Sequence, residues 1–209
     1  MNVTIIGTGN MARGIGSRLV AGGHDVTVLG KQTEAAEAVV QDIGGNGSAR
    51  AGRSGDPIAD DVMVLAVYYP DAKAAVEQYA DDLAGKVVVD ITNPVNESLD
   101  GLVTPPDGSA AQQLAASAPG ARVVKAFNTT FARTLRQGEV SGQPLDVFIA
   151  GDDDDAKATV SRLVNDGGLR PVDAGPLKRA RELEAAGLLH MSIQGPLGTG
   201  FGSALKVLA

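Results

Sequence analysis

Apolar and polar positions follow one another along this chain in two alternating patterns. Short runs of apolar, often β-branched residues are typical of buried strands, and apolar residues at every third or fourth position are typical of amphipathic helices. The chain begins with one pattern of each kind. Residues 2–6 predict a strand, and Met11, Ile15 and Leu19 then mark the apolar face of a helix that two glycines end.

The same alternation continues to the end of the chain. Further strands are expected at 25–29, 48–51, 62–67, 87–89, 122–127, 146–150 and 169–172. Further helices are expected at 34–42, 72–83, 105–118, 156–164 and from about 177 onward. Strands that are separated by helices pair in parallel, with helices covering both faces of the sheet. The predicted fold class is therefore α/β, a doubly wound parallel sheet of the Rossmann type with a small C-terminal α/β appendage.

The turn between the first strand and the first helix has the pattern G-x-G-x-x-A. Gly7 permits the tight turn, Gly9 lets a pyrophosphate approach the backbone, and Ala12 lets the helix pack closely on the strand. Free N–H groups at the start of the helix attract phosphate. We expect a dinucleotide here, with a purely structural turn as the alternative. The residues expected at this turn are Gly7, Thr8, Gly9, Asn10 and Met11.

The end of the second strand decides which dinucleotide is expected. An NAD site places Asp or Glu there to accept from the ribose 2′-hydroxyl, but this chain has Gly30 and Lys31. A lysine attracts a 2′-phosphate, so the sequence favours NADP, although Lys31 can also be a solvated loop residue. We expect residues 1–145 to form the NADP-binding domain. Residues 146–209 are too few for an independent catalytic domain and are expected to cap the sheet or form a dimer contact.

In an open parallel sheet, the ligand lies across the carboxyl ends of the strands. Tyrosine rings there can pack on a nicotinamide or a planar acceptor, and asparagine amides can bind ring substituents. The alternatives are that the tyrosines only cover the edge of the sheet and that the Asn-Pro pair is only a turn. The residues expected to line this pocket are Val67, Tyr68, Tyr69, Asn93, Pro94 and Asn128.

Few other titratable residues are candidates for chemistry. His24 lies at the sheet end opposite the ligand, and His190 lies in the C-terminal helix, where it reaches a pocket only through tertiary packing or a partner subunit. The four aspartates at 152–155 precede a helix and are expected to cap it rather than bind a metal. Lys125 is the best candidate for a buried cation, with a solvent-facing or ion-paired lysine as the alternative. No catalytic residue and no metal ligand is predicted.

Composition excludes several classes of function. The 209 residues contain no cysteine, which removes disulfides, thiol nucleophiles and iron–sulfur clusters. The net charge of −7 and the 3% of aromatic residues argue against nucleic acid as a partner. No apolar run approaches the roughly 18 residues of a membrane span, and no basic leader precedes the first strand. We therefore expect a cytoplasmic protein with no membrane or nucleic-acid partner.

Several motifs together resemble the family of NADP oxidoreductases that depend on coenzyme F420, an 8-hydroxy-5-deazaflavin. They lie at residues 7–11, 93–94, 125–129, 151–154 and 168–177, and the last stretch is the most specific. The resemblance implies that the two cofactors stack face to face and that a hydride passes between nicotinamide C4 and deazaflavin C5. It also implies a homodimer. By position, it places Thr8, Gly9, Asn10 and Met11 at the pyrophosphate, Gly30 and Lys31 at the 2′-phosphate, and Tyr69 and Ala132 near the nicotinamide.

The chain departs from the family pattern at two places. The usual Ser-Arg at the 2′-phosphate is replaced by Gly30 and Lys31, with Ala35 where a further lysine is common, and Asn128 replaces a histidine common near the deazaflavin. Residues 125–130 also resemble a bacterial group of dinucleotide-binding proteins and the reductase-like domain of metalloreductases, which passes NADPH electrons to a flavin.

The expected function is that of an NADP-dependent oxidoreductase that transfers a hydride between NADP(H) and a deazaflavin. Such chemistry needs no strong acid or base from the protein. One alternative is an NADPH-dependent reductase of a flavin, a quinone or another small acceptor. A second alternative is a sensor that binds NADP(H) without turnover. A pyrroline-carboxylate reductase type is disfavoured, because the chain is too short for the long helical dimerisation domain of those enzymes.

Overall fold

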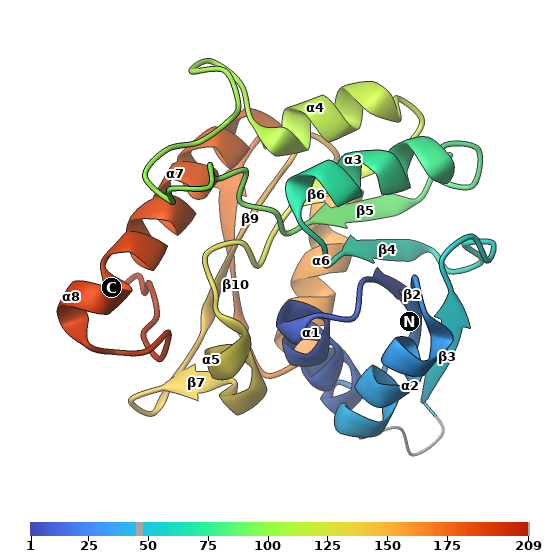
Figure 1. Cartoon of the computed structure of the whole chain (residues 1–209), viewed down its shortest axis with the longest axis horizontal. Coiled ribbons are helices and arrows are strands. Elements are labelled where there is room, and N and C mark those ends of the chain that lie inside the picture. The colour runs from blue at the N-terminus through green and yellow to red at the C-terminus, as the bar shows by residue number, and fades with distance from the viewer. Residues whose placement is uncertain (45–47, 209) are drawn as a thin grey trace.

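Eight strands of the protein form one sheet in the order β10-β9-β6-β5-β4-β1-β2-β3, with helices on both faces (Figure 1). The computed structural model describes residues 1–44 and 48–208. The strands of the sheet are β1 (Asn2–Ile6), β2 (Asp25–Gly30), β3 (Ala49–Arg53), β4 (Val62–Leu65), β5 (Val87–Asp90), β6 (Arg122–Lys125), β9 (Asp146–Gly151) and β10 (Arg170–Gly175). The helices are α1 (Asn10–Ala21), α2 (Thr33–Asp42), α3 (Tyr69–Gln78), α4 (Ala110–Ser117), α5 (Ala132–Gln137), α6 (Asp154–Asp166), the 3₁₀ helix η1 (Leu177–Arg179), α7 (Ala180–Ser192) and α8 (Gln194–Leu197).

The first six strands have the predicted doubly wound arrangement. They are parallel and lie in the order 3-2-1-4-5-6, which reverses between β1 and β4. A ligand crevice forms at such a reversal, because the connections leave the two neighbouring strands toward opposite faces of the sheet. The predicted α/β fold class is confirmed.

The last two strands differ from the prediction. β9 and β10 are parallel to each other, but β9 runs antiparallel to β6. A parallel crossover usually contains a helix that covers the sheet, whereas residues 126–145 form only the six-residue α5 and the hairpin of β7 (Glu139–Val140) and β8 (Gln143–Pro144) between β6 and β9. The strands expected in a small C-terminal appendage therefore belong to the main sheet, and β9 is the strand that departs from its parallel arrangement. The region from residue 146 onward extends the sheet and does not only cap it.

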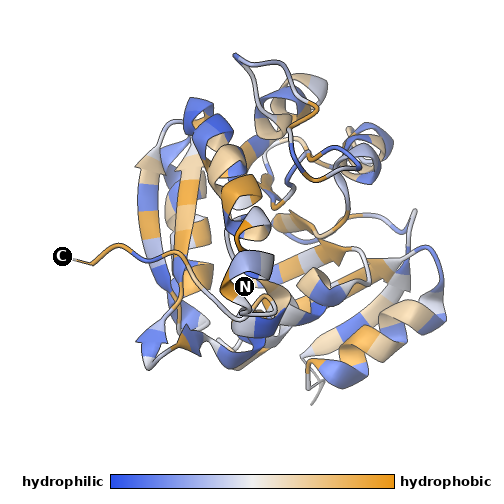
Figure 2. Cartoon of the chain, turned by 60° about the vertical axis from the view of Figure 1, so that its left-hand side comes forward, coloured by the Kyte–Doolittle hydropathy of each residue, from blue (hydrophilic) through white to orange (hydrophobic). Residues whose placement is uncertain are grey.

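The core consists of two apolar layers, one on each face of the sheet. Along β4, Val62 and Val64 belong to the layer under α1, α2, α5 and α6, and Met63 and Leu65 belong to the layer under α3, α4 and α7. This alternation follows from the two-residue period of a strand. Figure 2 shows apolar colouring along much of the sheet, whereas the helices around it carry both apolar and polar residues.

Several helix boundaries differ from the predicted ones. The helix expected at 72–83 ends at Gln78. Leu83 lies in the turns that follow the helix, and its side chain is buried there. The helix expected at 105–118 begins at Ala110, because Ser109 caps it by accepting a hydrogen bond from the Gln112 amide. Helix α5 and the β7–β8 hairpin were not predicted, since elements this short carry no periodic pattern. Among the described residues, no helix has the length and apolar character to cross a membrane.

Candidate active site

Two neighbouring cavities form a groove at the carboxyl ends of β1 and β4, where the strand order reverses. We call them the Lys31 cavity, of about 530 Å³, and the Asn93 cavity, of about 550 Å³. Thr8, Val67 and Asp71 line both cavities. The Lys31 cavity is also lined by Ile6, Gly7, Leu29, Gly30, Lys31, Gln32, Ala35, Ser54, Ala74, Ala75 and Gln78. The Asn93 cavity is also lined by Gly9, Asn10, Met11, Ala66, Tyr68, Ile91, Thr92, Asn93, Val95, Leu99, Asn128, Thr130, Phe131 and Met191.

The glycine turn lies at the junction of the two cavities. Gly7 has φ +121°, and a Cβ there would lie 2.3 Å from the Ala66 carbonyl oxygen, so the turn itself requires glycine. A Cβ on Gly9 would meet no described atom within 4 Å, because it would point into the groove. Gly9 is the N-cap of α1, and within the described chain no side chain caps that helix. Its first N–H groups are therefore free to bind an anion.

The Lys31 cavity has one cation. Lys31 is 84% exposed and donates to Asp71 Oδ1 at 2.9 Å from across the cavity. Within the described residues, no other Lys or Arg lines either cavity. Gly30 brings the chain close to the glycine turn, since a Cβ there would lie 2.8 Å from Thr8 Cγ2. This end of the groove suits the adenosine half of a dinucleotide, with Lys31 as the partner of a 2′-phosphate.

Two asparagines interlock beside the Asn93 cavity. Asn128 Nδ2 donates to Asn93 Oδ1 at 2.9 Å and to the Leu183 carbonyl at 2.8 Å. Asn93 Nδ2 donates in turn to the Asn128 carbonyl at 2.7 Å. Helix α7 approaches this pair closely at Gly187, where a Cβ would lie 2.5 Å from Asn93 Oδ1. The asparagines therefore tie the ends of β5 and β6 to the C-terminal helix.

Two buried polar atoms in this part of the site have no hydrogen-bond partner among the described residues. They are Oγ1 of Thr92 and Oδ1 of Asn128, both from residues that line the Asn93 cavity. Unpaired buried polar atoms are costly, and at a cavity they are candidates for hydrogen bonds to a ligand. These two atoms fit the polar ring substituents of a nicotinamide or a planar acceptor.

The turn after β6 holds Asn128 in place. Phe127, the residue before it, has the left-handed φ of 61° and is buried. Its carbonyl accepts from both the backbone amide of Thr130, at 3.0 Å, and the hydroxyl of Thr130, at 2.7 Å. Left-handed backbone is unusual for a residue with a side chain and is often found at functional sites.

A buried ionic cluster lies next to the Asn93 cavity. Lys125 is fully buried and also pairs with acids, as one of its two alternatives had it: its Nζ lies 2.8 Å from Asp90 Oδ2 and 2.9 Å from Glu184 Oε1. It also donates to the Thr92 carbonyl at 2.5 Å. Glu184 accepts from the Ala110 amide at 3.1 Å, so the cluster joins β5, β6, α4 and α7. Burial raises the pKa of Glu184, although the neighbouring Lys125 ammonium acts in the opposite direction.

Three of the predicted site residues, Tyr69, Pro94 and Ala132, line neither cavity. Tyr69 begins α3 one position after Tyr68, so its ring turns toward α4, where its hydroxyl donates to Gln113. Burial raises the Tyr69 pKa, as do the nearby Glu184 and Asp90 carboxylates. Ala132 begins α5, which packs against α1.

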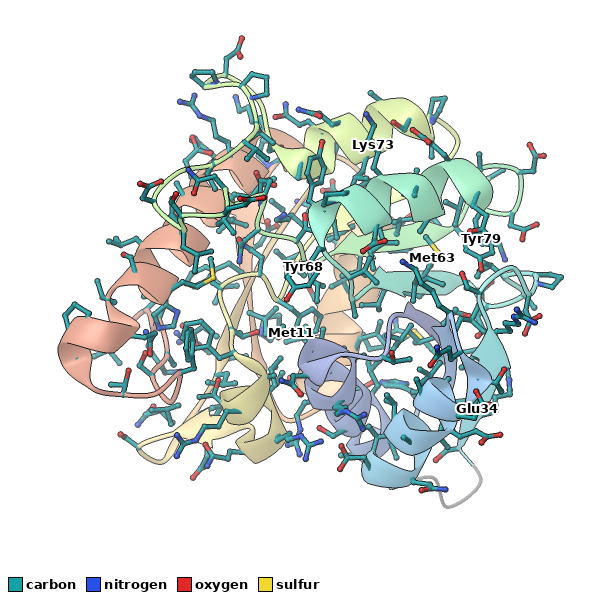
Figure 3. All side chains as sticks on the ribbon, viewed as in Figure 1. Met11, Glu34, Met63, Tyr68, Lys73 and Tyr79 are labelled. Carbon is teal, nitrogen blue, oxygen red and sulfur yellow. The ribbon has the colours of Figure 1, made fainter. Side chains whose placement is uncertain are left out.

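Tyr68, which is 85% exposed, lines the Asn93 cavity instead of Tyr69. Figure 3 shows Tyr68 and Met11 near each other, at the starts of α3 and α1. The sequence did not indicate Asp71, Leu99 or Met191 as cavity residues. The position of Asp71 could have been predicted, because this residue lies in the first turn of a helix that follows a central strand. The positions of Leu99 and Met191 could not, because tertiary packing brings them to the cavity.

Neither histidine lines the Lys31 cavity or the Asn93 cavity. His24 lies near the amino end of β2, where Nδ1 is 3.1 Å from the N-terminal amine and Nε2 is 3.3 Å from Asp166 Oδ2. His190 is buried, and its ring nitrogens contact the Thr129 carbonyl at 3.1 Å and Ser203 Oγ at 2.8 Å. Its ring also lies 4.3 Å from that of Phe131, so it supports one wall of the Asn93 cavity.

The aspartates at 152–155 have the structural role that the sequence predicted. Asp153 caps α6 by accepting from the Ala156 amide at 2.7 Å, and Asp152 accepts from the Leu177 amide at 2.8 Å. They follow the carboxyl end of β9. Because β9 runs antiparallel to β6, this end lies beside the amino ends of the parallel strands, away from the groove at their carboxyl ends. The described residues contain no group of three or more His, Cys, Asp or Glu placed to hold a metal ion.

The fold and the groove define the class of protein, a Rossmann-type dinucleotide-binding protein. Residues 2–94, which include the glycine turn and Asn93, match the family model described as NADP oxidoreductase coenzyme F420-dependent. This part of the chain is similar to the family of NADP oxidoreductases that its motifs resemble.

Relatives of known name extend the similarity beyond residue 94. The chain is 28% identical to the F420-dependent NADP reductase of Methanocaldococcus jannaschii over 203 residues, which cover 88% of each protein. A solved structure from Arthrobacter sp. FB24, provisionally described as an F420-dependent NADP reductase, is 28% identical with a TM-score of 0.87 and covers 99% of both chains. The chain is also 31% identical to Metalloreductase STEAP3 of Rattus norvegicus over 183 residues, which are 88% of this chain and 36% of that protein. It therefore spans about a third of the metalloreductase.

Proposed function

We propose that this protein transfers a hydride between NADP(H) and a deazaflavin of the coenzyme F420 type. NADP(H) would lie along the Lys31 cavity and the glycine turn, and the deazaflavin would enter the Asn93 cavity. The observation that carries the proposal is the joining of the two cavities at Thr8, Val67 and Asp71, which gives two planar rings one continuous space. The similarity to F420-dependent NADP reductases over 88% of the chain supports the choice of acceptor.

The residues of the groove suit binding and orientation. The free N–H groups at the start of α1 would hold the pyrophosphate, and Lys31 would bind the 2′-phosphate. Thr92 Oγ1 and Asn128 Oδ1 offer hydrogen bonds to polar ring substituents. When NADPH is bound, its nicotinamide supplies the hydride, so the protein has to align the rings and does not have to move a proton during the transfer itself.

The lining of the Asn93 cavity suits a protein that aligns the rings and leaves the chemistry to the nicotinamide. Its apolar side chains exclude water from the place where the rings would meet. In the described part of the chain, its lining holds no His, Lys, Arg or Glu, and the ionisable groups are Asp71 and Tyr68. The apolar lining residues are Met11, Ala66, Val67, Ile91, Val95, Leu99, Phe131 and Met191.

The proposal includes a homodimer in which residues 146–209 take part. Leu189 on α7 is 62% exposed and Leu197 on α8 is 59% exposed, so both offer apolar surface near the C-terminal end of the described chain. Analytical ultracentrifugation of the protein and of Leu189→Lys tests this. We expect a dimer that the substitution weakens, and a wild-type monomer at micromolar concentration would contradict the dimer.

The test of the proposed function is the anaerobic oxidation of NADPH with coenzyme F420 and with FMN offered separately. We expect rapid reduction of F420 and slow or no reduction of FMN. Gly9→Val is the matched control, because it fills the nucleotide groove and leaves the Asn93 and Asn128 pair intact. Turnover of FMN alone would indicate a flavin reductase and would contradict the deazaflavin as acceptor. Tight NADPH binding with no turnover of any acceptor would favour a sensor.

A further inference from the structure

The one cation of the Lys31 cavity already has a partner. Lys31 Nζ lies 2.9 Å from Asp71 Oδ1. The side chains are 84% and 48% exposed, so the pair lies in solvent and exchanges partners at little cost. A 2′-phosphate that binds Lys31 must therefore compete with the Asp71 carboxylate for the same ammonium group.

Asp71 also has a central position in the groove. It lies in the first turn of α3, on the wall opposite the end of β2, and it lines both cavities. Its neighbours on the same helix face, Ala74, Ala75 and Gln78, line the Lys31 cavity and are uncharged. The carboxylate of Asp71 is thus the one negative charge among the described lining residues of a groove that takes an anionic dinucleotide.

We propose that Asp71 is a specificity-determining residue that lowers the preference of this protein for NADP(H) over NAD(H). NAD(H) has no 2′-phosphate, so it binds while Lys31 stays paired with Asp71. NADP(H) requires Lys31 to leave Asp71 for the 2′-phosphate. The binding free energy gained from the 2′-phosphate is therefore only the difference between the Lys31–phosphate and Lys31–Asp71 ion pairs. This role of Asp71 rests on the proposed nucleotide site and adds to it a partner that opposes Lys31.

The experiment compares the dissociation constants of NADPH and NADH, measured by titration calorimetry without any acceptor. Asp71→Asn keeps the shape of the side chain and removes its charge. We expect the preference for NADPH over NADH to rise about threefold in this variant, as suits an exposed ion pair. The charge-free Asp71→Ser, which still suits the start of a helix, should change the preference in the same direction.

Two controls separate this role from a general effect of charge. Glu77→Gln removes one negative charge from the same helix at a position that lines neither cavity, so it should leave the preference unchanged. In a Lys31→Ala background, Asp71→Asn should also leave the preference unchanged, because no ammonium remains to be released.

Three results would overturn the role of Asp71. An unchanged preference in Asp71→Asn and Asp71→Ser would show that the ion pair does not affect the choice of nucleotide. A lower preference would mean that Asp71 helps to bind NADP(H) directly. In either case wild-type binding of NADPH leaves the proposed function intact. If the wild-type protein bound neither nucleotide, the proposed function and the role of Asp71 would both be wrong.

Discussion

Gly7 and Gly9 lie two residues apart in one turn, and they are glycines for different reasons. A side chain at Gly7 collides with the Ala66 carbonyl and is strained at φ +121°, whereas a Cβ at Gly9 enters open space in the groove. Gly9→Val should therefore fold with a near-normal Tm and lose binding of both NADPH and NADH. Gly7→Ala should lower the Tm itself. Calorimetry and a thermal melt of both variants check this. If Gly9→Val still bound NADPH, the nucleotide site could not lie at this turn.

In the proposed nucleotide site, Lys31 is the residue that we expect to select for the 2′-phosphate. Removal of this charge in Lys31→Ala should weaken NADPH binding by about 1 kcal/mol, the upper part of the range for exposed ion pairs, because Lys31 is exposed and must first leave Asp71. NADH binding should stay nearly unchanged. Titration with both nucleotides measures the two effects, and equal losses would contradict the role of Lys31.

The positions of individual residues were easiest to predict where they depend on a single loop. The glycine turn and Lys31 follow from the backbone and the chemistry of a single loop, and the structure places them in one groove. Both Tyr68 and Tyr69 were expected at the pocket, and the resemblance placed Tyr69 near the nicotinamide. One step along a helix turns a side chain by about 100°, so Tyr68 faces the cavity and Tyr69 does not. Met191 reaches the cavity from a helix distant in sequence, which no local pattern reveals.

At the scale of elements, the buried cluster around Lys125 joins the C-terminal helix to the centre of the sheet. Lys125→Met removes the cation and leaves the Asp90 and Glu184 carboxylates buried together. We expect the free energy of unfolding in urea to fall by about 3–5 kcal/mol, which is typical when one partner of a buried ion pair is removed. Glu184→Gln in the same background removes one of the two negative charges and should restore part of the loss. A loss below about 1 kcal/mol in Lys125→Met would contradict the role of the cluster.

The elements of the sheet were predictable from hydrophobic pattern, but their directions were predictable only in part. Helices connect successive strands from β1 to β6 at every step except that from β3 to β4, and the parallel arrangement follows from this alternation. Strand β9 has an equally apolar sequence, and its antiparallel direction depends on the shortness of α5 and of the hairpin before it. Because those elements are too short to show a period, the reversal of the chain left no signal in the sequence.

At the scale of the whole molecule, burial of both histidines makes stability depend on pH. Burial lowers the pKa of His24 and of His190, with the N-terminal amine adding to the effect at His24. Between about pH 7.5 and 5.5 the unfolded chain therefore takes up protons that the folded chain does not, and the free energy of unfolding falls as the pH falls. Glu184, whose pKa is raised, has the opposite effect as the pH falls toward its folded pKa.

The variant His190→Asn isolates one of these contributions. Urea unfolding at pH 7.5 and 5.5 should show a smaller loss of stability on acidification in the variant than in the wild-type protein. The carboxyls of Asp42, Asp146 and Asp173, whose pKa values are lowered, affect stability only at lower pH and are the same in both proteins. An equal or larger loss in the variant would mean that His190 is not held neutral in the folded state.

In the proposed function, the protein brings the nicotinamide and deazaflavin rings together in one groove. Transfer of an isotope label between the two rings tests this most directly. NADPH that carries deuterium at the transferred position of C4 is mixed with F420 and the protein in ordinary water, without oxygen. We expect the deuterium to appear at C5 of the reduced deazaflavin, because a hydride that passes directly between stacked rings does not exchange with solvent. Reduced deazaflavin without deuterium, or no reduction at all, would contradict direct transfer in this groove.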